Sequence, residues 1–260
     1  KKNYKAGTTK YKLSEFYKLS MDSVRRNEEG VRPVMPILNE MEAAKTLADL
    51  RKVQLNHPVA GYGIPLGYGF GADEKNAKMN ILQISQGGLT LGLKEYYLDN
   101  DAATKTIRDA YKQHIVKMFK LFGFDEAAAT AKRDAIMRFE TSVALISKNR
   151  TELRDVEANY NKTTLEAFKT DYPNIPLEEM ANAEGIKSEY LKDIVVGQPT
   201  FLAGVDKLLS VLTADDLRAI MEWDAILSAA SYLSDDIQAA NFEFFGKVMR
   251  GRQEDYPRWK

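Results

Sequence analysis

Apolar residues recur at intervals of three and four along most of the chain, which is the spacing of amphipathic helices. The clearest stripe runs through residues 104–122, and the same spacing places Leu13, Phe16, Tyr17 and Met21 on one face of a first helix. The pattern predicts helices over residues 11–26, 104–122, 125–147, 164–172, 199–212, 214–234 and 235–249, with shorter ones after Pro36, Thr46, Thr151 and Pro176. We therefore expect a mainly α, multi-helix domain that occupies residues 1–260.

Several of the expected helix boundaries carry residues that favour them. Thr46, Asp125 and Thr213 are expected N-caps, because their side-chain oxygens can accept hydrogen bonds from free N–H groups of the first turn. Pro199 suits a first turn, and Gly123 can end a helix. Aromatic residues at helical spacings near the end of the chain are expected in the core: Trp223, Tyr232, Phe242, Phe244 and Phe245.

Extended patterns are rare and cluster in one region. The runs LGYGFGA and MNILQISQ, separated by the polar segment DEKNAK, predict a β-hairpin around residues 66–86. Its loop is expected to be longer than the tightest hairpin turns. Residues 192–197 are a third strand candidate. The expected fold class is therefore mainly α with a small β-hairpin.

The hairpin follows a glycine-rich run, residues 60–76, which raises the question of a phosphate loop. A P-loop requires Lys followed by Ser or Thr, but Asn76 follows Lys75. The dinucleotide fingerprint G-x-G-x-x-G fails because Leu66 takes the place of its last glycine. The glycines are expected to let a strand bend or approach other backbone closely. The alternative is an edge strand that pairs with an extended peptide.

The composition excludes several classes of function. Lys and Arg total 37, as do Asp and Glu, so the net charge is zero and we expect no nucleic-acid partner. The chain has no cysteine, which excludes disulfides and thiolate chemistry. No apolar run approaches the ~18 residues of a membrane span. The start, KKNYKAGTTK, lacks the apolar part of a signal peptide, and its lysines are expected to be solvated.

Candidate catalytic groups do not form a constellation in the sequence. His57 and His114 stand alone, and neither H-E-x-x-H nor G-x-S-x-G occurs. Adjacent carboxylates do not share a helix face, so the pairs are expected to be helix-end or solvated charges. These pairs are Glu28-Glu29, Glu178-Glu179, Asp215-Asp216 and Asp235-Asp236. We assign no catalytic, cofactor-binding or metal-binding residue.

Six segments occur in a characteristic order along residues 12–259: LSEFYKLSMD, GADEKNAKMNILQISQGGLTLGLKEYYLD, AYKQHIVKMFKLFG, RFETSVA, YNKTTLEAF and LTADDLRAIMEWDAI. Among them are an acidic-Phe-Tyr helix followed by Met-Asp, a Lys-Asn turn between two strands, and Gly-Leu-x-Leu leading to Tyr-Tyr-Leu. In this order the chain resembles the N-terminal helical domain of the neprilysin and endothelin-converting-enzyme family of zinc metallopeptidases. The absence of cysteine is more like the bacterial members.

The resemblance implies an architecture and partners rather than chemistry in this chain. In the family, a helical domain covers a zinc domain and limits which peptides reach the metal. The zinc helix, the downstream glutamate ligand and the Asn-Ala substrate segment follow the matched region and are missing here. We therefore expect a catalytically silent, substrate-gating fragment of a longer two-domain zinc metalloendopeptidase. No cofactor is expected in this chain, and zinc is expected in the missing catalytic domain.

The same resemblance implies that the zinc-bearing catalytic domain and peptide substrates are the partners. It suggests an extracytoplasmic location, in the periplasm or cell envelope. The hairpin Gly67–Gln86 is a candidate for interdomain contact. Two other readings remain open: a stand-alone helical module that binds a peptide or protein in a groove, and a small-molecule enzyme built in a helical bundle. A gating domain predicts a large exposed apolar face, whereas a stand-alone module predicts a closed, polar-rimmed surface.

Overall fold

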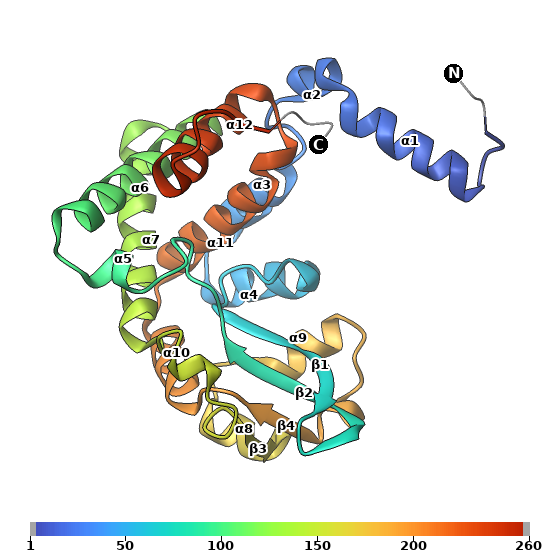
Figure 1. Cartoon of the computed structure of the whole chain (residues 1–260), viewed down its shortest axis with the longest axis vertical. Helices are drawn as coiled ribbons and strands as arrows, with labels where there is room; N and C mark the ends of the chain where they lie inside the picture. Colours follow the sequence, from blue (N-terminus) through green and yellow to red (C-terminus); the bar gives the residue numbers. More distant parts are fainter. Residues whose placement is uncertain (1–3, 257–260) are drawn as a thin grey trace.

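The computed structural model describes residues 4–256 and forms an arch with a helical half and a smaller half built on a β-sheet (Figure 1). Its α-helices are α1 (Thr9–Met21), α2 (Ser23–Glu29), α3 (Met35–Ala43), α4 (Leu47–Asn56), α5 (Glu95–Leu98), α6 (Ala102–Leu121), α7 (Glu126–Ile146), α8 (Leu165–Asp171), α9 (Leu177–Ala183), α10 (Pro199–Val211), α11 (Ala214–Ala229) and α12 (Asp235–Asn241). Its strands are β1 (Leu66–Asp73), β2 (Asn76–Gln86), β3 (Asn161–Thr164) and β4 (Asp193–Val196).

The helical half packs α3, α6, α7, α11 and α12 around one apolar core. The apolar stripe of α6 faces this core, where Tyr111 and Phe119 are fully buried. Trp223 of α11 lies between them, with its ring centroid 6.1 Å from that of Tyr111 and 5.9 Å from that of Phe119. Three large aromatic side chains therefore hold α6 against α11.

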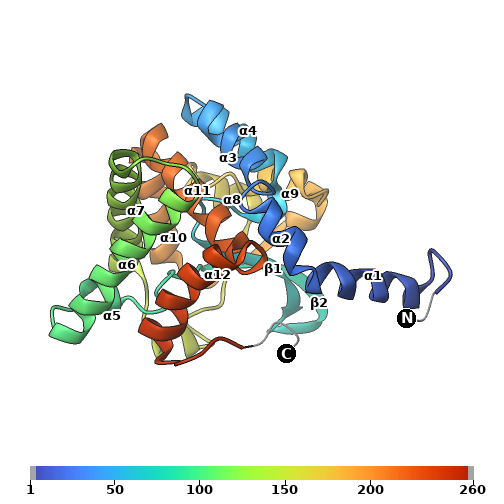
Figure 2. The ribbon, with the colours of Figure 1, turned by 90° about the horizontal axis from the view of Figure 1, so that it is seen from above.

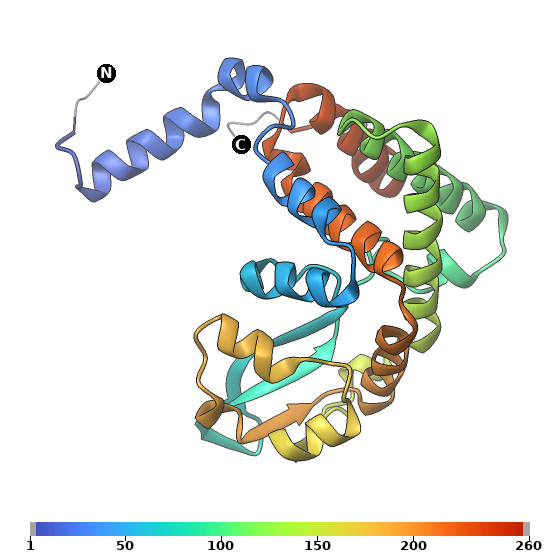
Figure 3. The same cartoon turned by 180° about the vertical axis from the view of Figure 1, so that it is seen from behind.

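The smaller half contains a four-stranded sheet in the order β1-β2-β4-β3. β1 and β2 are antiparallel, β4 runs parallel to β2, and β3 closes the other edge antiparallel to β4. Leu82 and Ile84 of β2 pack with apolar side chains of α8 and α10 in a second core. Phe139 and Val143 of α7 also join this core, so α7 connects the two halves along the back of the arch (Figure 3).

Much of the expected local structure is confirmed. The fold is mainly α with a small β element, and the hairpin covers residues 66–86 as predicted. Thr46, Asp125 and Thr213 are N-caps, each accepting a hydrogen bond from a backbone N–H of the first turn. The third strand candidate is β4.

Other expectations differ from the structure. The first helix is not continuous over residues 11–26, because Asp22 ends α1 and caps α2. The last helix covers the expected residues, although it changes to a π-helix at Phe242–Val248. The hairpin turn is tight, with Asp73 paired to Asn76 and a bulge beside it. β3 was missed because its four residues, NKTT, are polar. Tyr232 is not a core residue, since it is 78% exposed.

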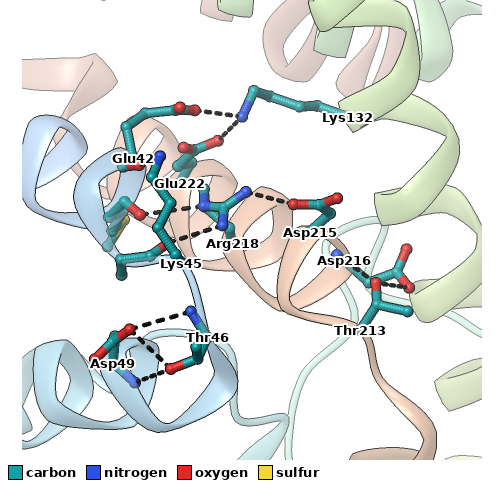
Figure 4. A network of polar contacts seen from close by, with 12 residues as sticks. Glu42, Lys45, Thr46, Asp49, Lys132, Thr213, Asp215, Asp216, Arg218 and Glu222 are labelled. Atoms are coloured by element: carbon teal, nitrogen blue, oxygen red, sulfur yellow. Dashed lines mark hydrogen bonds and ion pairs between the residues drawn. The ribbon is translucent and has the colours of Figure 1, made fainter.

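A buried ion cluster fixes the relative positions of α3, α7 and α11 (Figure 4). Lys132 Nζ of α7 lies 2.7 Å from Glu42 Oε1 of α3 and 2.6 Å from Glu222 Oε2 of α11. The Glu222 side chain is fully buried, and Lys132 is nearly so. Arg218, one turn away, donates to the backbone carbonyls of Met41 and Ala44. The end of α3 is therefore held to α11 by charged groups rather than by apolar packing alone.

Replacing Glu222 with glutamine is expected to flatten the pH dependence of stability. Burial raises the pKa of Glu222 to about 8 from an ordinary 4.5, and Lys132 partly opposes the shift. Because the folded chain holds this proton more tightly than the unfolded chain, the stabilisation is complete below pH 4.5 and is lost as the pH rises through about 8.

The measurement is chemical denaturation at about pH 5 and about pH 8. The free energy of unfolding should be lower at the higher pH for the wild type, and the difference should shrink in Glu222→Gln. Glu140 and Asp224, whose pKa values are raised by burial in the same direction, retain part of the slope. Equal pH dependence in the two proteins would contradict this assignment.

Candidate functional site

The first helix carries its apolar side chains into solvent. α1 projects from the body of the molecule in Figure 1 and, seen from above, in Figure 2. None of its residues is buried. Leu13, Phe16 and Tyr17 share one helical face, and their exposed fractions are 64%, 71% and 62%. Large contiguous apolar surface of this kind marks interaction sites on soluble proteins.

Local signals explain why α1 forms and where it ends. The Thr8 side chain accepts a hydrogen bond from Tyr11 N–H at 3.2 Å and caps its start. The Asp22 side chain accepts from Arg25 N–H at 3.0 Å, which starts α2 and ends α1. A helix of this length has little stability in water without tertiary packing. The apolar face of α1 therefore needs a partner surface.

The base of α1 is anchored through α2. Asn27 Nδ2 donates to Asp235 Oδ2 at 2.9 Å, and Asp235 N–H donates to Asn27 Oδ1 at 2.8 Å. Arg26 also lies 3.7 Å from Asp235 Oδ1. These contacts hold α2 against the start of α12 and so orient α1, which directly precedes α2. The apolar face of α1 itself remains exposed.

The two histidines lie in separate places. His114 is buried in α6 with its ring stacked on that of Phe244, the centroids 5.0 Å apart. Burial lowers the pKa of His114 to about 3, so its ring is neutral at physiological pH. His57 ends α4, and its Nε2 lies 2.9 Å from Glu40 Oε2. Within residues 4–256, no group of three or more His, Asp or Glu side chains could hold a metal ion.

Glu140 of α7 is the centre of a buried hydroxyl network. Its Oε1 accepts hydrogen bonds from the Thr90 and Tyr111 hydroxyls at 2.6 and 3.0 Å, and its Oε2 accepts from the Tyr97 hydroxyl at 2.9 Å. Burial raises the pKa of Glu140 to about 7, and these three hydrogen bonds oppose the shift. With Asp224 it faces a cavity of about 300 Å³. Because Tyr97 lies in α5 and Tyr111 lies in α6, these hydrogen bonds join both helices to α7 through Glu140.

The adjacent carboxylate pairs do not converge on one place. In Figure 4, Asp215 points to Arg218 and Asp216 points to Thr213. The remaining pairs are held in separate places: Glu29 binds Arg25 within α2, Glu178 of α9 binds Lys169 of α8, and Asp235 of α12 binds Asn27 of α2. The four carboxylate pairs that stood out in the sequence therefore lie apart from one another and do not form a shared site.

The glycine-rich run divides between a loop and a strand. Gly63, with a φ of 74°, donates its N–H to Asp224 Oδ2 at 2.7 Å. A Cβ at this position would lie 3.0 Å from side-chain atoms of Leu217 and Met221, so the loop can approach α11 only with glycine here. Gly67, Gly69 and Gly71 lie in β1. No helix in the described part of the chain is long and apolar enough to cross a membrane.

Comparison with known proteins identifies relatives over nearly the whole chain. The model of peptidase family M13 matches residues 1–260. Endothelin-converting enzyme 1 of Cavia porcellus is 27% identical over 96% of this chain and 34% of its own length. Neutral endopeptidase of Lactobacillus helveticus is 23% identical over 90% of this chain and 35% of its own length. The chain therefore spans about a third of the length of these relatives.

Solved structures share the fold over nearly the whole chain. Zinc metalloprotease ZMP1 of Mycobacterium tuberculosis superposes with a TM-score of 0.90 in its open state, at 24% identity, covering 99% of this chain and 40% of that one. Its complex with an inhibitor gives a TM-score of 0.91, with 99% and 39% covered. PEPO of Lactobacillus rhamnosis gives 0.77 at 21% identity, with 97% and 40% covered.

Proposed function

Since this chain belongs to peptidase family M13, as the N-terminal domain of its zinc metallopeptidases, we propose that it covers the catalytic domain of a longer zinc metalloendopeptidase. In this role it restricts access of peptide substrates to the active site. The domain acts by excluding large substrates and bulk water from a closed chamber, and it makes and breaks no bonds itself.

The observation that carries this proposal is the exposed apolar face of α1. Burying side chains such as Leu13 and Phe16 contributes about 1.5–3 kcal/mol each, which gives this helix a strong preference for an apolar partner. The chain spans about a third of its relatives' length, and we propose a further domain of the same protein as that partner. The anchored base of α1 would then set the orientation of one domain on the other.

The proposal assigns the zinc ion to the partner domain. The residues described here do not fit a zinc site: His114 is enclosed by aromatic rings, and His57 lies against a single carboxylate. No step of peptide hydrolysis is therefore derived from them. We further propose an extracytoplasmic location and peptide substrates, as inferences from the family.

The natural reading frame around this chain tests the proposal. We expect it to continue past residue 260 and to encode a helix with H-E-x-x-H, whose two histidines one turn apart can bind zinc. A frame without such a helix, and with no neighbouring gene that supplies one, would contradict the proposal. The chain would then be a helical binding module.

A further inference from the structure

The two edges of the sheet differ in how they are protected. β3, at one edge, is only four residues long and carries Lys162. A short strand and a charged side chain both discourage a further strand from pairing at an edge. β1, at the other edge, is eight residues long and has no charged side chain before Asp73. None of its residues before Asp73 is buried. The β1 edge is therefore open to another backbone.

Two hydrogen bonds establish which backbone groups of β1 face outward. Gly87 N–H donates to Pro65 C=O at 2.9 Å, and Gly197 N–H donates to Ile84 C=O at 2.7 Å. Because inward and outward groups alternate along an antiparallel pair, residues 67, 69 and 71 bond to β2, whereas Tyr68 and Phe70 point away from it. The N–H and C=O groups of Tyr68 and Phe70 have no hydrogen-bond partner among residues 4–256.

The side chains along β1 leave room for a second strand. Gly67, Gly69 and Gly71 occupy every second position, so β1 itself places no side chain on one of its faces between them. Gln83 and Ser85 of β2 lie over Gly71 and Gly67, and Gln83 Nε2 donates to Ala72 C=O at 3.0 Å. Gly69 is exposed, and no atom would lie within 4 Å of a Cβ placed there. The alternation of glycine with larger residues thus exposes the backbone itself, at the point where its outward groups are unpaired.

The opposite face of β1 offers contacts for side chains of an added strand. Tyr68 and Phe70 lie on this face, and the Tyr68 hydroxyl donates to Glu184 in the segment after α9. Phe70 also lines a cavity of about 930 Å³ together with Met79, Ile186 and Tyr190. In strand addition, main-chain hydrogen bonds give affinity and such pockets select alternate side chains.

We propose that the open edge of β1 binds an extended peptide by strand addition, through the main-chain groups of Tyr68 and Phe70. Unpaired backbone donors and acceptors in this spacing are matched by another extended backbone and not by a sugar, nucleotide or lipid. Under the proposed gating function, on which this reading of the ligand rests, the peptide is a substrate held outside the catalytic domain. The peptide's apolar side chains face Phe70.

Titration of a fluorescein-labelled peptide of alternating threonine and valine with this 260-residue chain tests the proposal. Phe70→Pro removes an outward N–H together with the aromatic ring, at an edge position where proline is tolerated, and should weaken binding by at least about tenfold. Phe70→Leu keeps that N–H and should bind within about threefold of the wild type. The same peptide with all its backbone nitrogens methylated should not bind. Circular dichroism verifies that both variants are folded.

Several results would overturn the proposal. One is the absence of saturable binding to the wild type, and another is equal affinity for Phe70→Pro and Phe70→Leu. If Phe70→Pro instead abolished self-association in sedimentation, the occupant would be a second copy of the chain. If it lowered the melting temperature of the parent protein but not of this chain, the occupant would be the rest of that protein. Because the peptide is titrated into this chain alone, its failure to bind leaves the docking of α1 untouched.

Discussion

Replacing Leu13 and Phe16 together with glutamate is expected to leave the melting temperature of this chain almost unchanged while strongly destabilising the parent protein. Both side chains are largely exposed here, and substitutions at such positions shift stability by only about 0.5 kcal/mol. In the parent protein the same residues would be buried against the catalytic domain. Losing their burial there would cost about 3–6 kcal/mol, before the additional cost of burying two carboxylates.

The measurement is a thermal unfolding experiment on both proteins with and without the double substitution. Lys12→Glu together with Lys18→Glu is the matched control, because it introduces two carboxylates on the same helix without removing apolar side chains. An equal shift of melting temperature in the two proteins would show that α1 has no docking role. So would an equal effect of the control pair in the parent.

Lys132→Met is expected to destabilise the chain by about 3–5 kcal/mol at about pH 9, where Glu222 is ionised. Lys132 is the cation between Glu42 and the fully buried Glu222. Without it, the ionised Glu222 side chain, which is fully buried, faces the carboxylate of Glu42 with no cation beside it. The loss should be smaller at lower pH, because the raised pKa of Glu222 lets that side chain take up a proton.

Lys120→Met is the matched control for this prediction. Lys120 pairs with Glu126 at the surface, where both side chains are more than half exposed, so its loss should cost at most about 1 kcal/mol. Denaturant unfolding of the two variants measures the difference. Equal losses in Lys120→Met and Lys132→Met would mean that the buried cluster does not hold α3 and α7 to α11.

The sequence predicted those parts of the fold in which local and tertiary preferences agree. The stripe of α6, the Thr213 cap and the hairpin follow from spacing or capping chemistry alone. β3 could not be read from NKTT, because its strand conformation depends on pairing with β4, which is distant in sequence. Asp22 was read as part of a helix, although an acid between two helical turns can also end one helix and cap the next.

The candidate site could be predicted only in part. The face of Leu13, Phe16 and Tyr17 was evident from periodicity, but periodicity does not distinguish a stripe that packs in this chain from one that awaits a partner. The alternation of glycine in β1 was also visible. That β1 lies at an edge depended on the arrangement β1-β2-β4-β3, which no local signal records.

The size dependence of peptide hydrolysis by the parent protein tests whether this domain restricts access to the active site. The measurement is the ratio of kcat/KM for a short peptide to that for the same cleavage sequence within a folded protein, with and without Leu13→Glu and Phe16→Glu. If the domain gates access, the wild type should strongly prefer the short peptide, and the preference should fall by at least about tenfold in the variant as the two domains separate. A ratio near one in the wild type, or a ratio unchanged by the substitutions, would contradict a gating role for this domain.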